Sequence, residues 1–256
     1  MDLITESPGV LATSYISMSG LLSLTSSEQL VAHIVYAANN GADVINMSLG
    51  AMLNKNGFYY DENGVLQKIP AVYIQSVISA QQRAIDYASE MGAVIIVSAG
   101  NEGYNADGGG SIIILPADLQ NVIAVSATAP DYWYGDLVNG INPLLDIPAS
   151  YTNYGKSLVD VAAPGGDYDF YPLVNYHWDM VLSTNLKGGY AWAAGTSMSS
   201  PHVAGVAALI IGKNGGEMSP QEATIQLLET ADKIDGYGIS AYYGNGRVNA
   251  FRAVTE

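Results

Sequence analysis

A serine between a glycine and the start of an apolar helix has the clearest chemical role in this sequence. Ser197 follows Gly195, and the small and apolar side chains of residues 203–211 predict a buried helix. A hydroxyl at a helix N-terminus faces backbone N–H groups without intrahelical acceptors, and it lies at the positive end of the helix dipole. Both features favour the oxyanion that forms when a serine attacks a carbonyl. The sequence therefore predicts that Ser197 is a nucleophile.

The segment around Ser197 resembles the serine motif of the subtilisin-like serine proteases, or subtilases. The match covers residues 195–205, Gly-Thr-Ser-Met-Ser-Ser-Pro-His-Val-Ala-Gly. Other segments resemble the same family in the same order, so the resemblance runs from about residue 10 to the C-terminus. They are Val-Ile-Asn-Met-Ser-Leu-Gly at 44–50, Val-Ile-Ile-Val-Ser-Ala-Gly-Asn-Glu-Gly at 94–103, Ser-Tyr-Thr-Asn-Tyr-Gly at 150–155, Val-Asp-Val-Ala-Ala-Pro-Gly at 159–165, and the closing segment at 242–250.

An oxyanion needs hydrogen-bond donors, and the resemblance assigns one of them to Asn101. Its side-chain amide would donate to the developing oxyanion, and the backbone N–H of Ser197 would be the second donor. Asn101 comes three residues after a predicted strand at 93–98, at the carboxyl end where open α/β sheets bind ligands. The alternative is a turn-forming asparagine in Ala-Gly-Asn-Glu-Gly.

The resemblance places the substrate cleft and its primary specificity pocket at two strand ends that should be adjacent. Glycine at each end would let a substrate backbone and side chain come close. Glu102 would lie near the floor or rim of the pocket, where it either helps to accept a basic side chain or is an exposed turn carboxylate. The other predicted substrate-binding residues are Ser48, Leu49, Gly50, Ser98, Ala99 and Gly100.

A subtilase serine works with an aspartate and a histidine, which precede it in the order Asp, His, Ser. The sequence contains neither Asp-Thr/Ser-Gly nor His-Gly-x-His. His33 is predicted on an amphipathic helix, in a surface or packing role, and His177 in an aromatic loop. His202 would lie about 140° around the helix from Ser197, in a structural role. We expect the C-terminal portion of a catalytic domain, with the two missing motifs upstream, and little or no proteolysis by this chain alone.

Strands alternate with helices along the chain, which predicts a parallel sheet covered on both faces. The predicted fold class is α/β, a three-layer doubly wound, mostly parallel sheet of subtilisin type that is incomplete at its N-terminus. We expect one domain over residues 1–256. The predicted strands are 9–18, 44–49, 93–98, 121–126 and 158–161, with a strand-like segment at 180–184, and the predicted helices are 26–40, 73–91, the one that follows Ser197, and 219–230.

Three insertions relative to a compact family member are expected, near 51–73, 131–149 and 166–178. The first contains two Asn-Gly turns, which predict a surface hairpin. The other two are aromatic, acidic loops that would extend the substrate cleft or bind calcium, since the family often carries structural Ca²⁺. No ligand set can be assigned, and the chemistry itself requires no cofactor.

Composition limits the partners of this chain. Nine Lys and Arg against 24 Asp and Glu give a net charge of −15, which repels nucleic acid and anionic lipid. Cysteine is absent, which excludes disulfides and cysteine metal sites. No apolar run approaches the ~20 residues of a membrane span, and residues 1–7 do not resemble a signal peptide. The resemblance implies an extracellular or cell-envelope location, with an export signal upstream.

Two functions from different classes fit these observations. The first is a serine endopeptidase of subtilisin type that cleaves polypeptides. The alternative is a non-catalytic peptide-binding module of the same fold, which kept the cleft and lost the triad. A third possibility is a separate N-terminal chain that carries Asp and His and completes the site in trans. The intact serine motif favours the endopeptidase.

Overall fold

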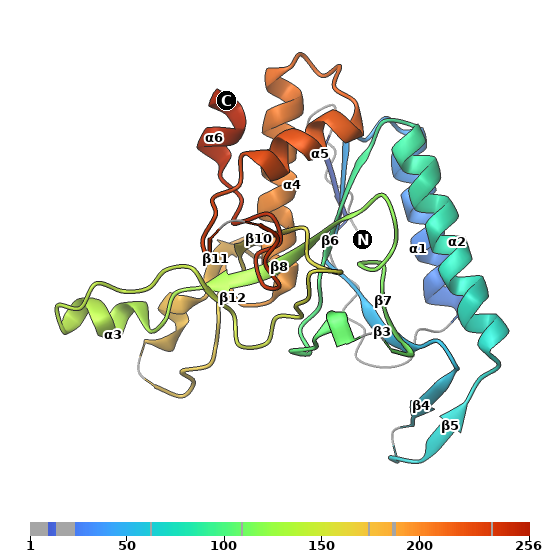
Figure 1. Ribbon diagram of the computed structural model, residues 1–256, viewed down its shortest axis with the longest axis horizontal. Coiled ribbons are helices and arrows are strands. Elements are labelled where there is room, and N and C mark those ends of the chain that lie inside the picture. The colour runs from blue at the N-terminus through green and yellow to red at the C-terminus, as the bar shows by residue number, and fades with distance from the viewer. Residues whose placement is uncertain are drawn as a thin grey trace.

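The computed structural model of the protein describes residues 10–13, 24–61, 63–108, 110–173, 175–185, 188–236 and 238–256, with side chains from residue 27 onward (Figure 1). The helices are α1 (Leu24–Asn39), α2 (Ala71–Glu90), α3 (Trp133–Val138), α4 (Thr196–Lys213), α5 (Pro220–Glu229) and α6 (Ala250–Thr255), with short 3₁₀ turns η1 (Ala106–Gly108) and η2 (Tyr176–Asp179). No helix among these residues combines the length and the apolar character that a membrane span requires.

A parallel sheet forms the centre, with strands in the order β1-β2-β6-β8-β10. Every residue of β2, β6 and β8 is buried, as expected for parallel strands with both faces covered. A short strand, β9 (Ile147–Pro148), pairs antiparallel with β8. The parallel strands are β1 (Val10–Thr13), β2 (Val44–Met47), β6 (Val94–Ser98), β8 (Ile123–Ala129) and β10 (Val161–Pro164).

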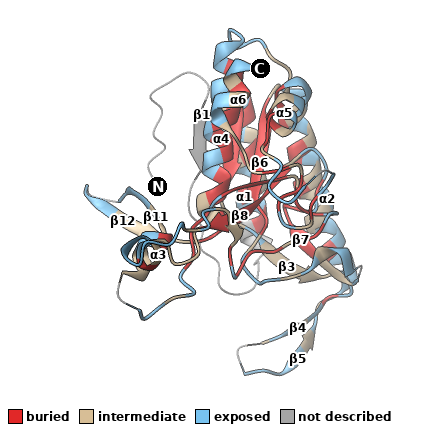
Figure 2. Ribbon diagram, turned by 60° about the vertical axis from the view of Figure 1, so that its left-hand side comes forward, coloured by how far each residue is buried: buried red, intermediate tan, exposed pale blue. Residues whose placement is uncertain are grey.

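The two faces of the sheet pack against different helices. Along β6, Val94 and Ile96 join the hydrophobic core that contains α4, α5 and α6, whereas Ile95 and Val97 join the core that contains α1 and α2. Successive side chains of a strand point to opposite faces, which produces this alternation. Figure 1 shows α1 and α2 together on one side, and Figure 2 shows the buried sheet between the helix layers. The three-layer α/β architecture is therefore confirmed.

The predicted strand at 158–161 was placed too early, because β10 begins at Val161. Leu158 and Val159 are buried, but their N–H groups donate to the Gly155 carbonyl in a tight turn. Apolar residues in this segment indicated burial, not strand geometry. Of the predicted strand 9–18, the structure describes only residues 10–13, and the rest lies outside the described residues.

The expected insertions form small elements outside the main sheet. The Asn-Gly turns do accompany a hairpin, β4 (Phe58–Tyr60) with β5 (Leu66–Lys68), and β3 (Ala51–Asn54) pairs with β7 (Ile112–Leu115). The segments 131–149 and 166–178 contain α3 and η2. A second hairpin, β11 (Val181–Thr184) with β12 (Tyr190–Ala193), then leads to α4.

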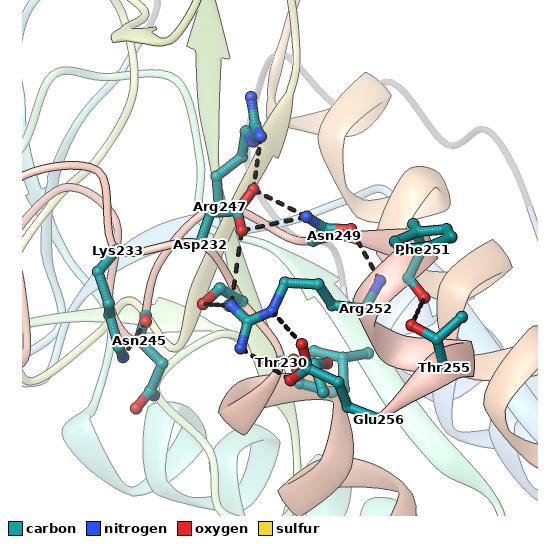
Figure 3. A network of polar contacts seen from close by, with 12 residues as sticks. Thr230, Asp232, Lys233, Asn245, Arg247, Asn249, Phe251, Arg252, Thr255 and Glu256 are labelled. Carbon is teal, nitrogen blue, oxygen red and sulfur yellow. Dashed lines mark hydrogen bonds and ion pairs between the residues drawn. The ribbon is translucent and has the colours of Figure 1, made fainter.

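The C-terminal segment is tied to the rest of the domain by ionic contacts (Figure 3). The Arg247 guanidinium bridges Asp146 and Asp232, and the Asn249 amide donates to both carboxylate oxygens of Asp232. The Asn249 side-chain oxygen also accepts from the Arg252 N–H and caps α6. These contacts connect the end of the chain with the segment at 131–149.

Candidate active site

Ser197 is the second residue of α4, as the sequence predicted, and it is half-buried. The helix begins directly after Gly195, whose φ of 151° favours glycine. The Gly195 N–H donates to the Gly165 carbonyl at 3.0 Å, which fixes the turn before the helix. The Ser197 hydroxyl lies 3.4 Å from the Ser48 carbonyl oxygen at the end of β2. The candidate nucleophile therefore lies where α4 meets the carboxyl edge of the sheet.

A proline in α4 leaves the Ser197 carbonyl without its helical donor. In an α-helix this carbonyl would accept from the N–H of residue 201, but Pro201 has none. The Ser48 hydroxyl donates to the Ser197 carbonyl oxygen instead, at 2.9 Å, and also lies 2.9 Å from the Ser200 hydroxyl. This contact connects the end of β2 to the helix turn that carries Ser197.

Asn101 is held by its side-chain oxygen. That oxygen accepts from the Thr196 N–H at 2.9 Å and from the Thr196 hydroxyl at 2.8 Å, while the hydroxyl accepts from the Gly100 N–H at 3.2 Å. The Asn101 amide nitrogen remains as a donor. A Cβ built on Gly195 would lie 3.7 Å from this nitrogen and 3.7 Å from the Ser197 backbone nitrogen. The Met198 sulfur lies at the same distance, so the two predicted oxyanion donors and this sulfur border one space beside Gly195.

The two strand ends predicted to form the substrate cleft are neighbours, because β2 and β6 pair in parallel. The Ser98 hydroxyl at the end of β6 donates to the Leu49 carbonyl after β2, at 3.3 Å. Ala99 is 0% exposed and Ser98 only 4%, so both are buried beneath the surface at these strand ends. Gly50 is exposed, whereas Ser48 and Leu49 are half-buried. The accessible surface at these strand ends therefore comes from residues 48–50 and from the turn after Ala99, and the substrate cleft stays a prediction.

A buried asparagine, Asn153, organises that turn. Its amide nitrogen donates to the Ala99 carbonyl at 2.9 Å and to the Glu102 carboxylate at 2.7 Å, and its oxygen accepts from two backbone N–H groups, one of them that of Glu102. A Cβ on Gly100 would lie 2.3 Å from the Asn153 amide nitrogen, so only glycine fits there. Glu102 is exposed, and one carboxylate oxygen accepts from both Asn153 and the Asn101 N–H.

The turn before α4 also rests on a buried tyrosine. The Tyr151 hydroxyl donates to the carbonyls of Gly165 and Gly166, at 3.1 and 2.6 Å. Burial, with the nearby Asp167 carboxylate, raises the pKa of Tyr151 well above its usual value, which keeps the hydroxyl protonated as a donor. Gly165 in turn accepts from Gly195, so Tyr151 supports the backbone on which Ser197 stands.

Comparison with known proteins assigns the chain to a family. The sequence model of the Subtilase family matches residues 7–246. The chain belongs to the subtilase family. This subtilase is 35% identical over 222 residues to the thermophilic serine proteinase of Bacillus sp. (strain AK1). The match covers 87% of this chain and 40% of that protein.

Two further relatives agree. Thermitase from Thermoactinomyces vulgaris is 35% identical over 221 residues, with 86% of this chain and 57% of thermitase covered. The crystal structure of a lanthipeptide protease superposes with a TM-score of 0.67 at 26% identity, covering 89% of this chain and 65% of that chain. The subtilase chain spans about half the length of the curated relatives that it matches.

The three histidines of this subtilase contact residues other than Ser197. His33 lies on α1, on the face of the sheet opposite to α4, and is half-buried. His177 packs against Trp178 and Trp192, each with ring centroids 5.4 Å away. His202 is exposed, and its Nδ1 lies 2.7 Å from the carbonyl of Met198 on its own helix. The structural roles predicted for the three histidines stay predictions.

Two residues that position Asn101 and the turn around it, Thr196 and Asn153, were not predicted from the sequence. Thr196 lies inside the serine motif and Asn153 inside another matched segment, so their place in family motifs was the available signal. What they bind became visible only in the fold. In the described part of the chain, no three His, Asp or Glu side chains come together as a metal site. Calcium binding stays a prediction without a ligand set.

Proposed function

We propose that this chain carries the nucleophile and the oxyanion hole of a subtilisin-type serine endopeptidase. The observation that supports it most directly is the space beside Gly195, which the Asn101 amide and the Ser197 N–H both border. Thr196 fixes the Asn101 oxygen and so leaves the amide nitrogen free to donate. Donors preorganised in this way stabilise charge in the transition state without reorganising.

The proposed reaction is acyl transfer. The Ser197 oxygen bonds to the carbonyl carbon of a peptide and gives its proton to a base, while the carbonyl electron pair moves onto oxygen. Asn101 and the Ser197 N–H donate to that oxyanion. Cleavage of the C–N bond then releases the amine, which takes a proton, and water hydrolyses the acyl-serine. The substrates are polypeptides that bind along residues 48–50 and 100–102.

The base is the part of the mechanism that this chain does not supply. A serine hydroxyl without a base is a weak nucleophile near neutral pH. We therefore propose that the chain alone hydrolyses peptides slowly or not at all, and that a segment with Asp and His completes the site. We also propose an extracellular or cell-envelope location, since one relative from Xanthomonas campestris pv. campestris is named an extracellular protease.

Chemical rescue tests this proposal. Imidazole in solution would act as the missing base, so a fluorophosphonate probe should label Ser197 faster as imidazole concentration rises. Ser197→Ala should abolish the labelling. Asn101→Ala should slow it roughly 10²-fold, which is the magnitude known for loss of the oxyanion-hole asparagine in subtilisin, a relative of this chain. Mass spectrometry of the labelled peptide identifies the modified residue.

A peptide-binding module is the second candidate, favoured by the positions of the three histidines. A chain that folds cooperatively but shows no imidazole-dependent labelling at Ser197 would overturn the endopeptidase proposal in favour of this module. Labelling that is equally fast in Asn101→Ala would overturn the oxyanion hole. Near-ultraviolet circular dichroism of each variant confirms that the compared proteins are folded.

A further inference from the structure

A continuous aromatic surface lies beside the candidate active site, on α3, η2 and the hairpin β11–β12. Figure 2 shows α3, β11 and β12 together at one side of the molecule, and η2 packs against α3. We name it the aromatic surface and define it by six exposed residues, which are between 37% and 75% accessible. They are Tyr134, Leu137, Tyr171, Trp178, Leu182 and Tyr190.

Ring contacts make this surface continuous. Trp178 stacks on Tyr134 with centroids 6.2 Å apart, and it packs against Trp192 at 5.5 Å. Leu182 lies directly opposite Trp192 across the hairpin, and Tyr190 is two residues before Trp192, so all three share one face. Tyr171 joins through an edge contact with Tyr176, whose ring contacts His177 beside Trp178.

The surface is connected to the nucleophile at both of its ends. Strand β12 ends two residues before Gly195, and the segment that leads to η2 leaves from Gly165, the acceptor of the Gly195 N–H. Trp192 is five positions before Ser197, so their Cα atoms lie within about 18 Å. A substrate bound at Ser197 therefore needs at most about five or six extended residues to reach the aromatic surface.

The charge of this region defines the substrate that fits it. Residues 131–149 and 166–193 contain six aspartates and one basic residue, Lys187. Among the six, Asp146 is paired with Arg247. Asp169 is exposed, and Asp131 and Asp136 are half-buried. Lysine and arginine pair with carboxylates and are also attracted to the faces of tryptophan and tyrosine rings. An exposed apolar patch bordered by aspartates is therefore complementary to a segment that alternates basic and apolar side chains.

We propose that the aromatic surface binds a basic, apolar segment of the polypeptide substrate, within about six residues of the bond that is cleaved. This inference rests on the proposed endopeptidase function and gives that function a substrate class. Binding at this distance would select substrates by a second region and would leave the chemistry at Ser197 unchanged. Leucine or phenylalanine side chains would cover Leu182 and Trp178, while lysine or arginine would lie near Asp136 and Asp169.

Fluorescence anisotropy with three labelled 12-residue peptides tests the proposal in the Ser197→Ala chain, which cannot form an acyl-enzyme. The first peptide alternates Lys with Leu and Phe, the second replaces Lys by Glu, and the third replaces Leu and Phe by Ser. We expect the first to bind at least tenfold more tightly than either of the others. Equal affinity for the first and third would show net charge attraction alone and would overturn the proposal.

A matched pair of variants locates the binding. Leu182→Ser removes an apolar side chain that is 51% exposed in hairpin β11–β12, and Leu66→Ser removes one that is 54% exposed in hairpin β4–β5. We expect Leu182→Ser to weaken binding of the first peptide about tenfold and Leu66→Ser to leave it unchanged. Equal loss in both, or loss in neither, would overturn the proposal.

Two more measurements separate this inference from other occupants and from failure of the proposed function. If analytical ultracentrifugation shows a dimer that becomes a monomer in Leu182→Ser, the surface binds a second copy of the chain and the proposal is overturned. In chains that retain Ser197, Leu182→Ser should leave imidazole-dependent labelling unchanged, because the probe is too small to reach the surface. If the unaltered chain is not labelled at Ser197 but still prefers the first peptide, the endopeptidase proposal is overturned and the binding proposal stands.

Discussion

The Ser48 hydroxyl donates to the Ser197 carbonyl, the one acceptor in the first turns of α4 that Pro201 leaves without a helical donor. The two serines are 149 residues apart in the chain, and the bond joins the end of β2 to the helix that carries the nucleophile. A buried carbonyl without a donor costs free energy. Because Pro201 has no N–H, the donor to the Ser197 carbonyl comes from Ser48, the residue that follows β2.

A double-mutant cycle of Ser48 and Pro201 measures how far the Ser48 hydroxyl replaces the helical N–H that Pro201 lacks. Ser48→Ala should lower the free energy of unfolding by about 1–2 kcal/mol, because it leaves the Ser197 carbonyl without that donor. Pro201→Ala restores a backbone N–H at the helical position, so it should recover part of the loss in the Ser48→Ala background. Urea unfolding gives both values. Strictly additive effects would contradict the compensation.

The hydroxyl of Thr196 should contribute to the reactivity of Ser197 through Asn101. Thr196→Val keeps the size and the backbone bond but removes the hydroxyl that donates to the Asn101 oxygen. We expect imidazole-assisted labelling of Ser197 to slow roughly threefold to tenfold, the value of one hydrogen bond. Thr196→Ser retains the hydroxyl and should restore the rate. Equal rates in all three proteins would show that Asn101 needs no such anchor.

Gly195→Ala should block the oxyanion space. The added methyl group would lie 3.7 Å from both donor nitrogens, on a backbone with φ of 151° that strains any other residue. We expect labelling to fall at least a hundredfold. Gly212→Ala is the matched control, since its Cβ meets nothing within 4 Å in helix α4. It should stabilise the fold by about 0.5–1 kcal/mol and leave labelling unchanged.

The pH dependence of stability should reveal Asp160. Burial raises the pKa of Asp160 to about 6, although the carboxylate accepts a hydrogen bond from the Ala124 N–H. Because the folded state holds this proton more tightly than the unfolded state, stability falls as pH rises from about 4 to about 6 and stays lower above that range. Asp160→Asn should therefore raise Tm by about 4 °C at pH 8 and lose this gain near pH 4.

Thermal unfolding in a chelating buffer checks this prediction without interference from bound cations. Asn at position 160 can still accept from the Ala124 N–H, so the comparison isolates the charge. A Tm difference that is the same at pH 4 and pH 8 would show that the carboxyl group does not titrate in this range in the folded state.

Local patterns were sufficient for most of the helices and strands. The apolar runs at 44–49 and 93–98 predicted β2 and β6, and Ser219 with Pro220 predicted the start of α5, where the structure has a capping box. The strand at 158–161 was misplaced because burial at Leu158 occurs in a turn. Strands β3, β7 and β12 were not predicted, since each depends on a partner strand for its pairing.

The sequence by itself determined the α/β class, the helix that begins beside Ser197 and the family motifs, because these follow from residues close together in the chain. Only the tertiary structure decided that Thr196 holds Asn101, 95 residues away, and that Ser48 replaces the donor missing at Pro201. Hydrogen bonds of this kind depend on which strand ends the fold brings to one edge of the sheet. No local periodicity encodes such a distance, so the geometry of the site became visible only when the chain was folded.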